Sequence, residues 1–216
     1  MSLAKKMKQF EKIEFYPVVT QKFCNGKKSL DILKELVDAG IKIVQLREKE
    51  MSKRELFYLG EKYRKITEDN DMLFIMNDHI DIAMAVAADG VHLGQNDFPF
   101  EKVRDIEQNL IVGVSTHNLD EIVQAQKFDI SYINVGPIFP TQTKEVGVPS
   151  VGLDNLAQWV PYIKIPFTVM GGIKKTNLVS LYELGVYRTA MVTEITQSSD
   201  IKKTIQEMRN IRREFS

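Results

Sequence analysis

The chain has 216 residues, of which 44% are hydrophobic, so it can bury a sizeable core as one domain, although two small domains also fit this length. Lys plus Arg and Asp plus Glu number 29 each, which gives a net charge of zero and excludes the broad positive field of a non-specific nucleic-acid-binding protein. No apolar stretch approaches the roughly 18 to 20 residues of a membrane span, so we expect no membrane partner.

Cysteine usage and the first residues indicate the compartment. Cys24 is the single cysteine, so the chain cannot form an intramolecular disulfide, which fits a reducing compartment. The first 14 residues, MSLAKKMKQFEKIE, contain lysines but no long apolar region, unlike a signal peptide. We therefore expect a soluble cytoplasmic protein.

From its start, the chain alternates short β-rich runs with stretches of helical spacing. A β-rich run over 14–20 is followed by a helical stripe over 29–40, which ends on glycine as a helix C-cap often does. A second run over 41–47 precedes a helix over 52–71, and the sequence SKRE at its start predicts a capping box.

The same alternation continues to the end of the chain. Further β-rich runs follow at 72–78, 90–95, 110–116, 132–139 and 166–172. The chain then closes with a helix over 177–185, a strand over 189–195 and an amphipathic helix over 199–215. Eight strand–helix units imply parallel strands joined by right-handed crossovers. An open doubly wound sheet is the alternative, but about 200 residues with eight units favour a closed barrel. We predict an α/β fold, a single (β/α)8 TIM barrel over 14–216, preceded by an N-terminal extension over 1–13.

The residues at the carboxyl ends of the expected strands are polar or glycine, and the active site of such a barrel forms at these ends. In strand order they are Gln45, Arg47, Lys49, Asn77, Asp78, Asp97, Ser115, the residues of 141–144, Gly171, Gly172 and Thr193. Alternate side chains of a strand share a face, so Gln45, Arg47 and Lys49 are expected to point the same way. We expect all of these groups at one mouth.

The charges of this group indicate its ligand. Arg47, Lys49 and Lys144 are three cations, which suits a ligand with several phosphate charges. Asp78 and Asp97 would repel such a ligand unless a hard cation lay between them, and Mg²⁺ binds one or two carboxylates together with phosphate oxygens. The sequence therefore predicts a site for a diphosphate with Mg²⁺.

A second phosphate site is expected near the end of the chain. The loops after the seventh and eighth strands form the usual phosphate site of these barrels, and here they carry Gly171, Gly172 and the pair at 192–193. Thr141 and Thr143 would add hydroxyl donors. A diphosphate and a monophosphate in one mouth indicate two substrates that must meet, as in a transferase.

Six motifs carry a resemblance to a known family. They are QLREK (45–49), ND (77–78), ADGVHLGQND (88–97), VGVSTHNLDE (112–121), GPIFPTQTK (136–144) and VMGGI (169–173). Their residues, order and spacing resemble those of thiamine phosphate synthases over residues 14–195. The resemblance implies a (β/α)8 barrel that joins 4-amino-2-methyl-5-hydroxymethylpyrimidine diphosphate to a thiazole monophosphate, giving thiamine phosphate and pyrophosphate by a Mg²⁺-assisted dissociative substitution.

The resemblance also implies a role for each matching residue. The pyrimidine diphosphate would be bound by Gln45, Arg47, Lys49, Asn77, Ser115 and Lys144. The thiazole phosphate would be bound by Thr141, Thr143, Gly172, Val192 and Thr193. Asp78 and Asp97 would be the magnesium ligands. The partners are then small-molecule substrates, with no nucleic acid and no membrane, and a homo-oligomer is compatible with the sequence.

Three departures from the family pattern concern the thiazole end. Thr193 stands where serine is common, Glu194 stands where a small residue is usual, and the segment VYRTA (186–190) is bulkier than its counterparts. Glu194 would weaken phosphate binding if it pointed inward, and 186–190 is expected to crowd the back of the last strand.

Other interpretations of the same residues stay open. Arg47 and Lys49 could instead form surface ion pairs with Glu48 or Glu50. His117 could act as an acid or base, as a histidine does in proteins resembling thiazole tautomerase, but we favour a helix-start histidine bonded to backbone. His79 and His92 are expected to be structural. A thiazole tautomerase-like enzyme or a non-catalytic protein that binds thiamine precursors is the functional alternative, although neither needs the carboxylate pair.

Overall fold

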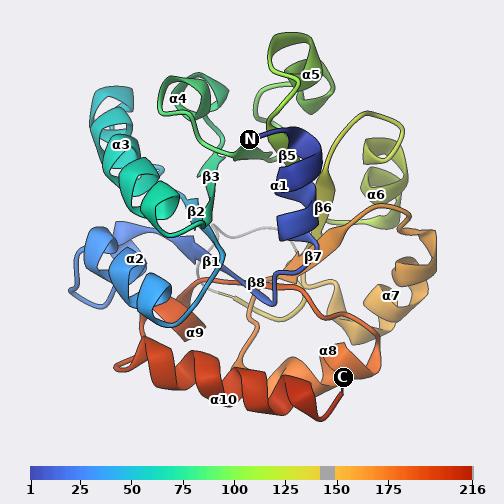
Figure 1. Cartoon of the computed structure of the whole chain (residues 1–216). Helices are drawn as coiled ribbons and strands as arrows, with labels where there is room; N and C mark the ends of the chain where they lie inside the picture. The colour runs from blue at the N-terminus through green and yellow to red at the C-terminus, as the bar shows by residue number, and fades with distance from the viewer. Residues whose placement is uncertain (142–148, 216) are drawn as a thin grey trace.

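The computed structural model describes residues 1–141 and 149–215, and their strands form a closed parallel barrel (Figure 1). The strands are β1 Phe15–Val19, β2 Ile43–Leu46, β3 Leu73–Asn77, β4 Gly90–Leu93, β5 Ile111–Thr116, β6 Tyr132–Val135, β7 Phe167–Met170 and β8 Thr189–Met191. Each strand pairs with the next in sequence, and β1 pairs with β8 to close the ring. The predicted TIM barrel is confirmed, and the open sheet is excluded.

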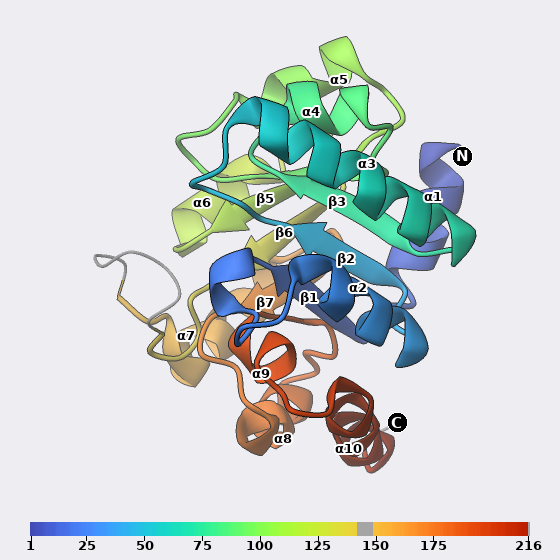
Figure 2. The same cartoon turned by 90° about the vertical axis from the view of Figure 1, so that its left-hand side faces the viewer.

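Helices surround this ring (Figures 1 and 2). They are α1 Leu3–Phe10, α2 Ser29–Asp38, α3 Lys53–Asp69, α4 Ile80–Ala85, α5 Val103–Ile106, α6 Leu119–Ala125, α7 Gly152–Trp159, α8 Leu178–Glu183, α9 Thr193–Thr196 and α10 Ile201–Arg213. Short 3₁₀ turns lie at η1 Gln21–Phe23, η2 Phe100–Lys102, η3 Val160–Tyr162 and η4 Lys175–Asn177. The predicted capping box is present at the start of α3, where Ser52 and Glu55 exchange side-chain-to-backbone hydrogen bonds.

The largest differences from the predicted strands are at two carboxyl ends. The last strand was expected over 189–195, but it ends at Met191, because the backbone turns at Val192 and the amides of Ile195 and Thr196 donate to the Val192 carbonyl to form α9. The sixth strand was expected over 132–139, but it ends at Val135, since Pro137 has no N–H for the ladder. The residues after β8 therefore form a short helix at the mouth, and those after β6 form a loop.

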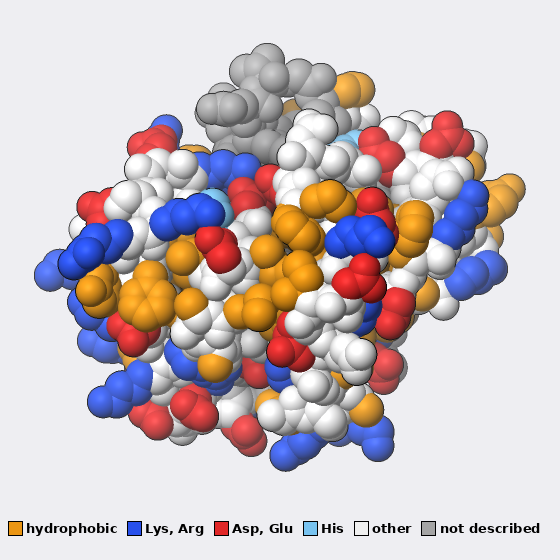
Figure 3. All heavy atoms as spheres, turned by 90° about the horizontal axis from the view of Figure 1, so that it is seen from above, with side chains coloured by type: hydrophobic (Ala, Val, Ile, Leu, Met, Phe, Trp, Pro, Cys, Tyr) orange, Lys and Arg blue, Asp and Glu red, His pale blue; other side chains and the backbone are white. Residues whose placement is uncertain are grey.

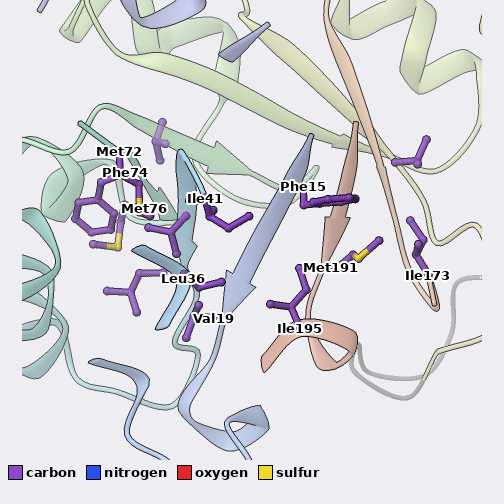
Figure 4. Packing of buried hydrophobic residues seen from close by; sticks show 14 of the residues in the cluster. Phe15, Val19, Leu36, Ile41, Met72, Phe74, Met76, Ile173, Met191 and Ile195 are labelled. Carbon is purple, nitrogen blue, oxygen red and sulfur yellow. The ribbon is translucent and has the colours of Figure 1, made fainter. Parts of the chain in front are cut away.

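The core has two layers because the strand side chains alternate between faces. Phe15 and Val19 of β1 point outward and join the cluster between strands and helices, part of which is shown in Figure 4. Tyr16 and Val18 point inward and join a second cluster that fills the barrel with Ile43 of β2. The inner cluster places the inward face of β2 at odd-numbered residues.

The segment 1–13, predicted as an extension, contains α1, which lies at one end of the barrel (Figure 2). Phe10 is fully buried, and its ring centroid is 4.5 Å from that of Tyr132 inside the barrel. The Lys6 ammonium is also buried and donates to the carbonyls of Asp89, at 3.1 Å, and Asn109, at 3.0 Å. These carbonyls precede β4 and β5, so α1 closes the amino-terminal end of the strands.

The surface agrees with the zero net charge. In the view of Figure 3, positive and negative side chains are interspersed with apolar ones, without a large area of one sign. Among the helices of residues 1–141 and 149–215, none has the length and apolar character that crossing a membrane requires.

Candidate active site

The polar end of β2 divides its side chains between two directions. Gln45 is buried on the inward face, and Arg47 is half-buried one step beyond the strand, where its amide still donates to the Val19 carbonyl at 2.9 Å. Glu48 turns the other way and accepts a 2.6 Å hydrogen bond from the Gln21 amide. Burial raises the pKa of the Glu48 carboxyl, although that hydrogen bond and the Arg47 charge oppose the shift. The pairing of β2 with β1 therefore extends one residue past the strand, to Arg47.

Lys49 forms an ion pair with a residue that follows the next strand, β3, and not with its sequence neighbours. Its ammonium lies 3.0 Å from Oδ2 of Asp78, whereas Glu50 pairs with Lys22 at 3.6 Å. Asp78 follows β3 with a φ of 62°, and its amide donates to the His92 carbonyl at 2.8 Å. This backbone geometry brings the Asp78 carboxylate to the carboxyl end of β4.

Asp78 and Asp97 interact directly. Burial and a hydrogen-bonding contact with Asp97 raise the pKa of Asp78, while Lys49 opposes the shift. Burial also acts against ionisation of Asp97, but the contact with Asp78 and the 2.6 Å hydrogen bond from the Gly94 amide hold its pKa below the ordinary value. The two carboxyl groups thus compete for one proton, and a cation between them would remove this conflict.

These two carboxylates fit Mg²⁺ better than a protein-enclosed metal. In the described part of the chain, no group of three or more His, Cys, Asp or Glu side chains gathers as a metal cluster. Mg²⁺ needs only one or two carboxylates, because water and substrate phosphates complete its octahedral shell. Asp78 and Asp97 are therefore suited to hold Mg²⁺ together with a phosphorylated ligand.

Two more of the predicted residues lie near the carboxyl ends of β3 and β5. Asn77 is buried at the last position of β3, and Ser115 is half-buried near the end of β5. The Ser115 hydroxyl lies 2.9 Å from Nε2 of His92, and its carbonyl accepts from Gln95 at 2.7 Å. Thr143 and Lys144 lie outside the described residues.

The predicted thiazole-phosphate residues meet at a small cavity of about 40 Å³. Its lining includes Thr141, Gly172, Val192 and Thr193. Gly172 has a φ of 63°, and a Cβ atom built on it would lie 2.4 Å from the Pro140 carbonyl oxygen. Only glycine allows the loop after β6 to approach the loop after β7 this closely.

A second hollow of about 30 Å³ adjoins this cavity. Ser115 and His117 line it on one side, and it shares Thr141, Met170 and Gly171 with the first cavity. The two hollows therefore lie side by side between Ser115 and Gly172.

Of the departures at the thiazole end, Thr193 lines the cavity, whereas the Glu194 carboxylate is held beside it by residues that follow β7. Glu194 accepts from the Lys175 amide at 2.9 Å, and its other oxygen lies 3.7 Å from the Lys174 ammonium. Within 186–190, Arg188 precedes β8 and donates to the Glu11 carbonyl at the amino-terminal end, whereas Ala190 lines the cavity.

Two of the histidines lie near strand ends at the mouth. His117 follows β5, and its Nδ1 lies 2.9 Å from Oε2 of Glu121, which also accepts the His117 amide. His92, expected to be structural, lies on β4 with its Nε2 2.9 Å from the Ser115 hydroxyl. Its position between Val91 and Leu93, both outward-facing, was the sequence signal that it points into the barrel.

The fold and site together define a (β/α)8-barrel enzyme of phosphorylated substrates, with an acidic pair and a glycine-lined cavity at the carboxyl ends of its strands. A family model described as thiamine monophosphate synthase matches residues 15–195. The chain is 38% identical over 218 residues to the thiamine-phosphate synthase of Caldicellulosiruptor saccharolyticus, covering 100% of this chain and 99% of the relative. It is 34% identical to that of Pyrococcus furiosus, covering 93% and 95%.

Solved structures agree with these sequence relatives. Thiamine phosphate pyrophosphorylase from Pyrococcus furiosus superposes with a TM-score of 0.85 at 32% identity, covering 94% of this chain and 96% of that one. A 3-hexulose-6-phosphate synthase superposes with a TM-score of 0.66 at 14% identity, which shows the shared fold alone. The chain belongs to the thiamine monophosphate synthase family.

Proposed function

We propose that the protein is a transferase that condenses 4-amino-2-methyl-5-hydroxymethylpyrimidine diphosphate with a thiazole monophosphate, giving thiamine phosphate and pyrophosphate. The observation that carries this proposal is the contact of Asp78 with both Asp97 and Lys49 at the mouth of the barrel. A carboxylate pair beside a cation is suited to a metal-bound diphosphate, and a monophosphate isomerase has no use for it.

The diphosphate end would act by stabilising a leaving group. The bond between the pyrimidine methylene carbon and the diphosphate oxygen breaks, and the oxygen keeps the electron pair. Arg47, Lys49 and Lys144 would bind the departing oxygens, where negative charge develops. Asp78 and Asp97 would hold Mg²⁺, which when bound supplies further positive charge to the leaving group.

The thiazole end would position the nucleophile. Gly172, Val192 and Thr193, with Thr141 and Thr143, would bind the monophosphate through backbone amides and hydroxyl groups. The adjoining hollows support this arrangement, because Met170 and Gly171 border both. The thiazole nitrogen then donates its lone pair to the pyrimidinyl-methyl cation, so the new C–N bond forms without a protein nucleophile or general base.

Gln45, Asn77 and Ser115 would bind the pyrimidine ring side of the diphosphate substrate. All three lie at inward-facing positions near the carboxyl ends of β2, β3 and β5, on the mouth side of the inner cluster. Their role as ring ligands, a cytoplasmic location and a homo-oligomeric state stay predictions of the proposal.

The test uses the purified full chain with both substrates, with Mg²⁺ or with a chelator. We expect thiamine phosphate and pyrophosphate in equal amounts, and only with metal. Asp78→Asn and Asp97→Asn should lower turnover by more than about 100-fold through weakened metal binding. The matched control is Asp81→Asn, since Asp81 is an exposed carboxylate of α4 that pairs with Lys53.

Three outcomes would contradict the proposal. They are full activity in the chelator, equal losses in the Asp81→Asn control, and isomerisation of a thiazole carboxylate phosphate without condensation. The last result would instead support a tautomerase.

A further inference from the structure

A chain of hydrogen bonds crosses the interior of the barrel between two of the proposed ring ligands. Gln45 donates from Nε2 to the Tyr16 hydroxyl at 3.0 Å, and that hydroxyl lies 3.0 Å from the hydroxyl of Tyr132. Tyr132 in turn lies 2.8 Å from Nδ1 of His92, whose Nε2 lies 2.9 Å from the Ser115 hydroxyl. Five strands, β2, β1, β6, β4 and β5, each contribute one member.

The barrel is built to hold this chain. Gln45, Tyr16, Tyr132 and His92 are all buried within the inner layer. A Cβ atom on Gly113 of β5 would lie 2.2 Å from the Tyr132 ring, so the glycine leaves the space that this ring occupies. Buried polar groups are costly without partners, and here each member has one on either side or faces the mouth.

The protons of this chain have a defined order. Burial raises the pKa of Tyr16 and of Tyr132 far above the ordinary value, so both hydroxyls carry their single proton. The amide nitrogen of Gln45 can only donate, so the Tyr16 oxygen accepts from it. Either tyrosine could donate in the bond between the two hydroxyls; we assign the donor to Tyr16, because its buried proton would be costly without an acceptor and the Tyr132 oxygen lies 3.0 Å away. The Tyr132 proton then goes to Nδ1 of His92, which takes the Nε2–H tautomer.

The last link sets the role of Ser115. Nε2–H of His92 donates to the Ser115 oxygen, so the Ser115 proton is left for a group other than His92. Ser115 lines the hollow beside Thr141 and Gly171, and a ligand there would meet it as a donor.

We propose that this chain positions the pyrimidine half of the diphosphate substrate: Gln45, at one end, imposes the Nε2–H tautomer on His92 and a donor role on Ser115. Tyr16, Tyr132 and His92 are then positioning residues, which act on the ligand only through Gln45 and Ser115. The identity of the ligand rests on the proposed function, whereas the order of the protons does not.

The first test needs no substrate. The protein has three histidines, and the signals of His92 in ¹⁵N-labelled protein are assigned by their loss in His92→Gln. Long-range ¹H–¹⁵N spectra should show a proton on Nε2 and none on Nδ1 in the wild type. A proton on Nδ1 would mean that the bonds run in the opposite sense or that the ring is charged, and either result overturns the proposal.

The second test separates positioning from stability. Tyr132→Phe removes one hydroxyl of the chain, and Tyr63→Phe is the matched control, because the fully buried Tyr63 of α3 donates to the Ser29 carbonyl at 3.1 Å outside the barrel. Binding of the pyrimidine diphosphate and of the thiazole phosphate is measured by calorimetry. Tyr132→Phe should weaken the first by about fivefold and leave the second within about twofold.

The outcomes are distinct from those of the condensation assay. Equal weakening of both ligands, or equal effects of Tyr132→Phe and Tyr63→Phe, would refute positioning. If Tyr132→Phe does not fold, Tyr16→Phe interrupts the chain at the next link and is judged by the same criteria. If the wild type binds no pyrimidine diphosphate, the proposed function and the positioning role fail together, while the tautomer of His92 still decides the order of the protons.

Discussion

Replacing Gly172 by alanine tests how closely the two loops of the phosphate cavity approach each other. Gly172 has a φ of 63°, and its Cβ would lie 2.4 Å from the Pro140 carbonyl oxygen and 2.8 Å from Cβ of Phe139. Gly185, after α8, is the control: its φ is 74°, but no atom lies within 4 Å of a Cβ built there. Both substitutions impose the same backbone strain, and only Gly172→Ala adds a steric conflict.

The magnitudes follow from this difference. A non-glycine residue in the left-handed region costs about 1 to 2 kcal/mol, so Gly185→Ala should lower the free energy of unfolding by that amount. Overpacking against a fixed neighbour adds about 1 to 3 kcal/mol, so Gly172→Ala should lower the free energy of unfolding by about 2 to 5 kcal/mol. The backbone must move to relieve the conflict, and the amides of the cavity move with it.

Two measurements check this prediction. Urea unfolding gives the free energies, and steady-state kinetics give KM for each substrate. We expect Gly172→Ala to raise KM for the thiazole phosphate by about tenfold, the equivalent of one lost hydrogen bond to a charged oxygen, with a much smaller change for the pyrimidine diphosphate. Equal stabilities of the two variants, with an unchanged KM for the thiazole phosphate, would refute the close approach of the loops.

Three further substitutions test other parts of the molecule. Asp89→Asn removes the carboxylate whose oxygens lie 2.7 Å from the Arg64 guanidinium and 3.7 Å from the Lys6 ammonium. Urea unfolding should show that the free energy of unfolding falls by about 3 to 5 kcal/mol. A fall of less than about 1 kcal/mol would contradict a buried ion cluster. Glu48 has a pKa raised by burial, so the folded state binds its proton more tightly than the unfolded state, and wild-type stability should fall as the pH rises through that raised pKa. Glu48→Gln should therefore gain stability relative to the wild type as the pH rises above about 4, and a difference that does not vary with pH would be evidence against the shift. Glu194→Gln keeps an acceptor for the Lys175 amide and removes a negative charge beside the phosphate cavity. KM for the thiazole phosphate should therefore fall by about threefold at low salt and by less at high salt. A change in KM that does not depend on salt would argue against an electrostatic cause.

The barrel was predictable because its signals are local. Each strand is a short apolar run bounded by polar or glycine residues, and the alternation within β2 already placed Gln45 on the inward face. The boundary between β8 and α9 was not predictable in the same way. Ile195 is apolar and extends the run TAMVTEI, and the turn at Val192 comes from backbone hydrogen bonds that the side-chain pattern does not encode.

In the candidate site, too, features set by local sequence could be predicted and features set by distant residues could not. The acidic pair could be predicted, because Asp78 and Asp97 follow successive strands whose carboxyl ends meet at one mouth. The orientation of Glu194 depends on Lys175, a residue of another loop. The partners of His92 come from strands 23 and 40 residues further along the chain, so no local pattern could indicate its place between Ser115 and Tyr132.

The position of α1 has a consequence for truncated forms of the protein. Phe10 covers the inner tyrosines from beneath, with ring centroids 4.5 Å from Tyr132 and 6.4 Å from Tyr16. A protein lacking its first ten residues would retain all eight strands and all the proposed ligand-binding side chains, and yet water could enter the barrel floor and compete for the phenol groups. The N-terminal helix thus closes the amino-terminal end of the barrel and excludes water from its interior.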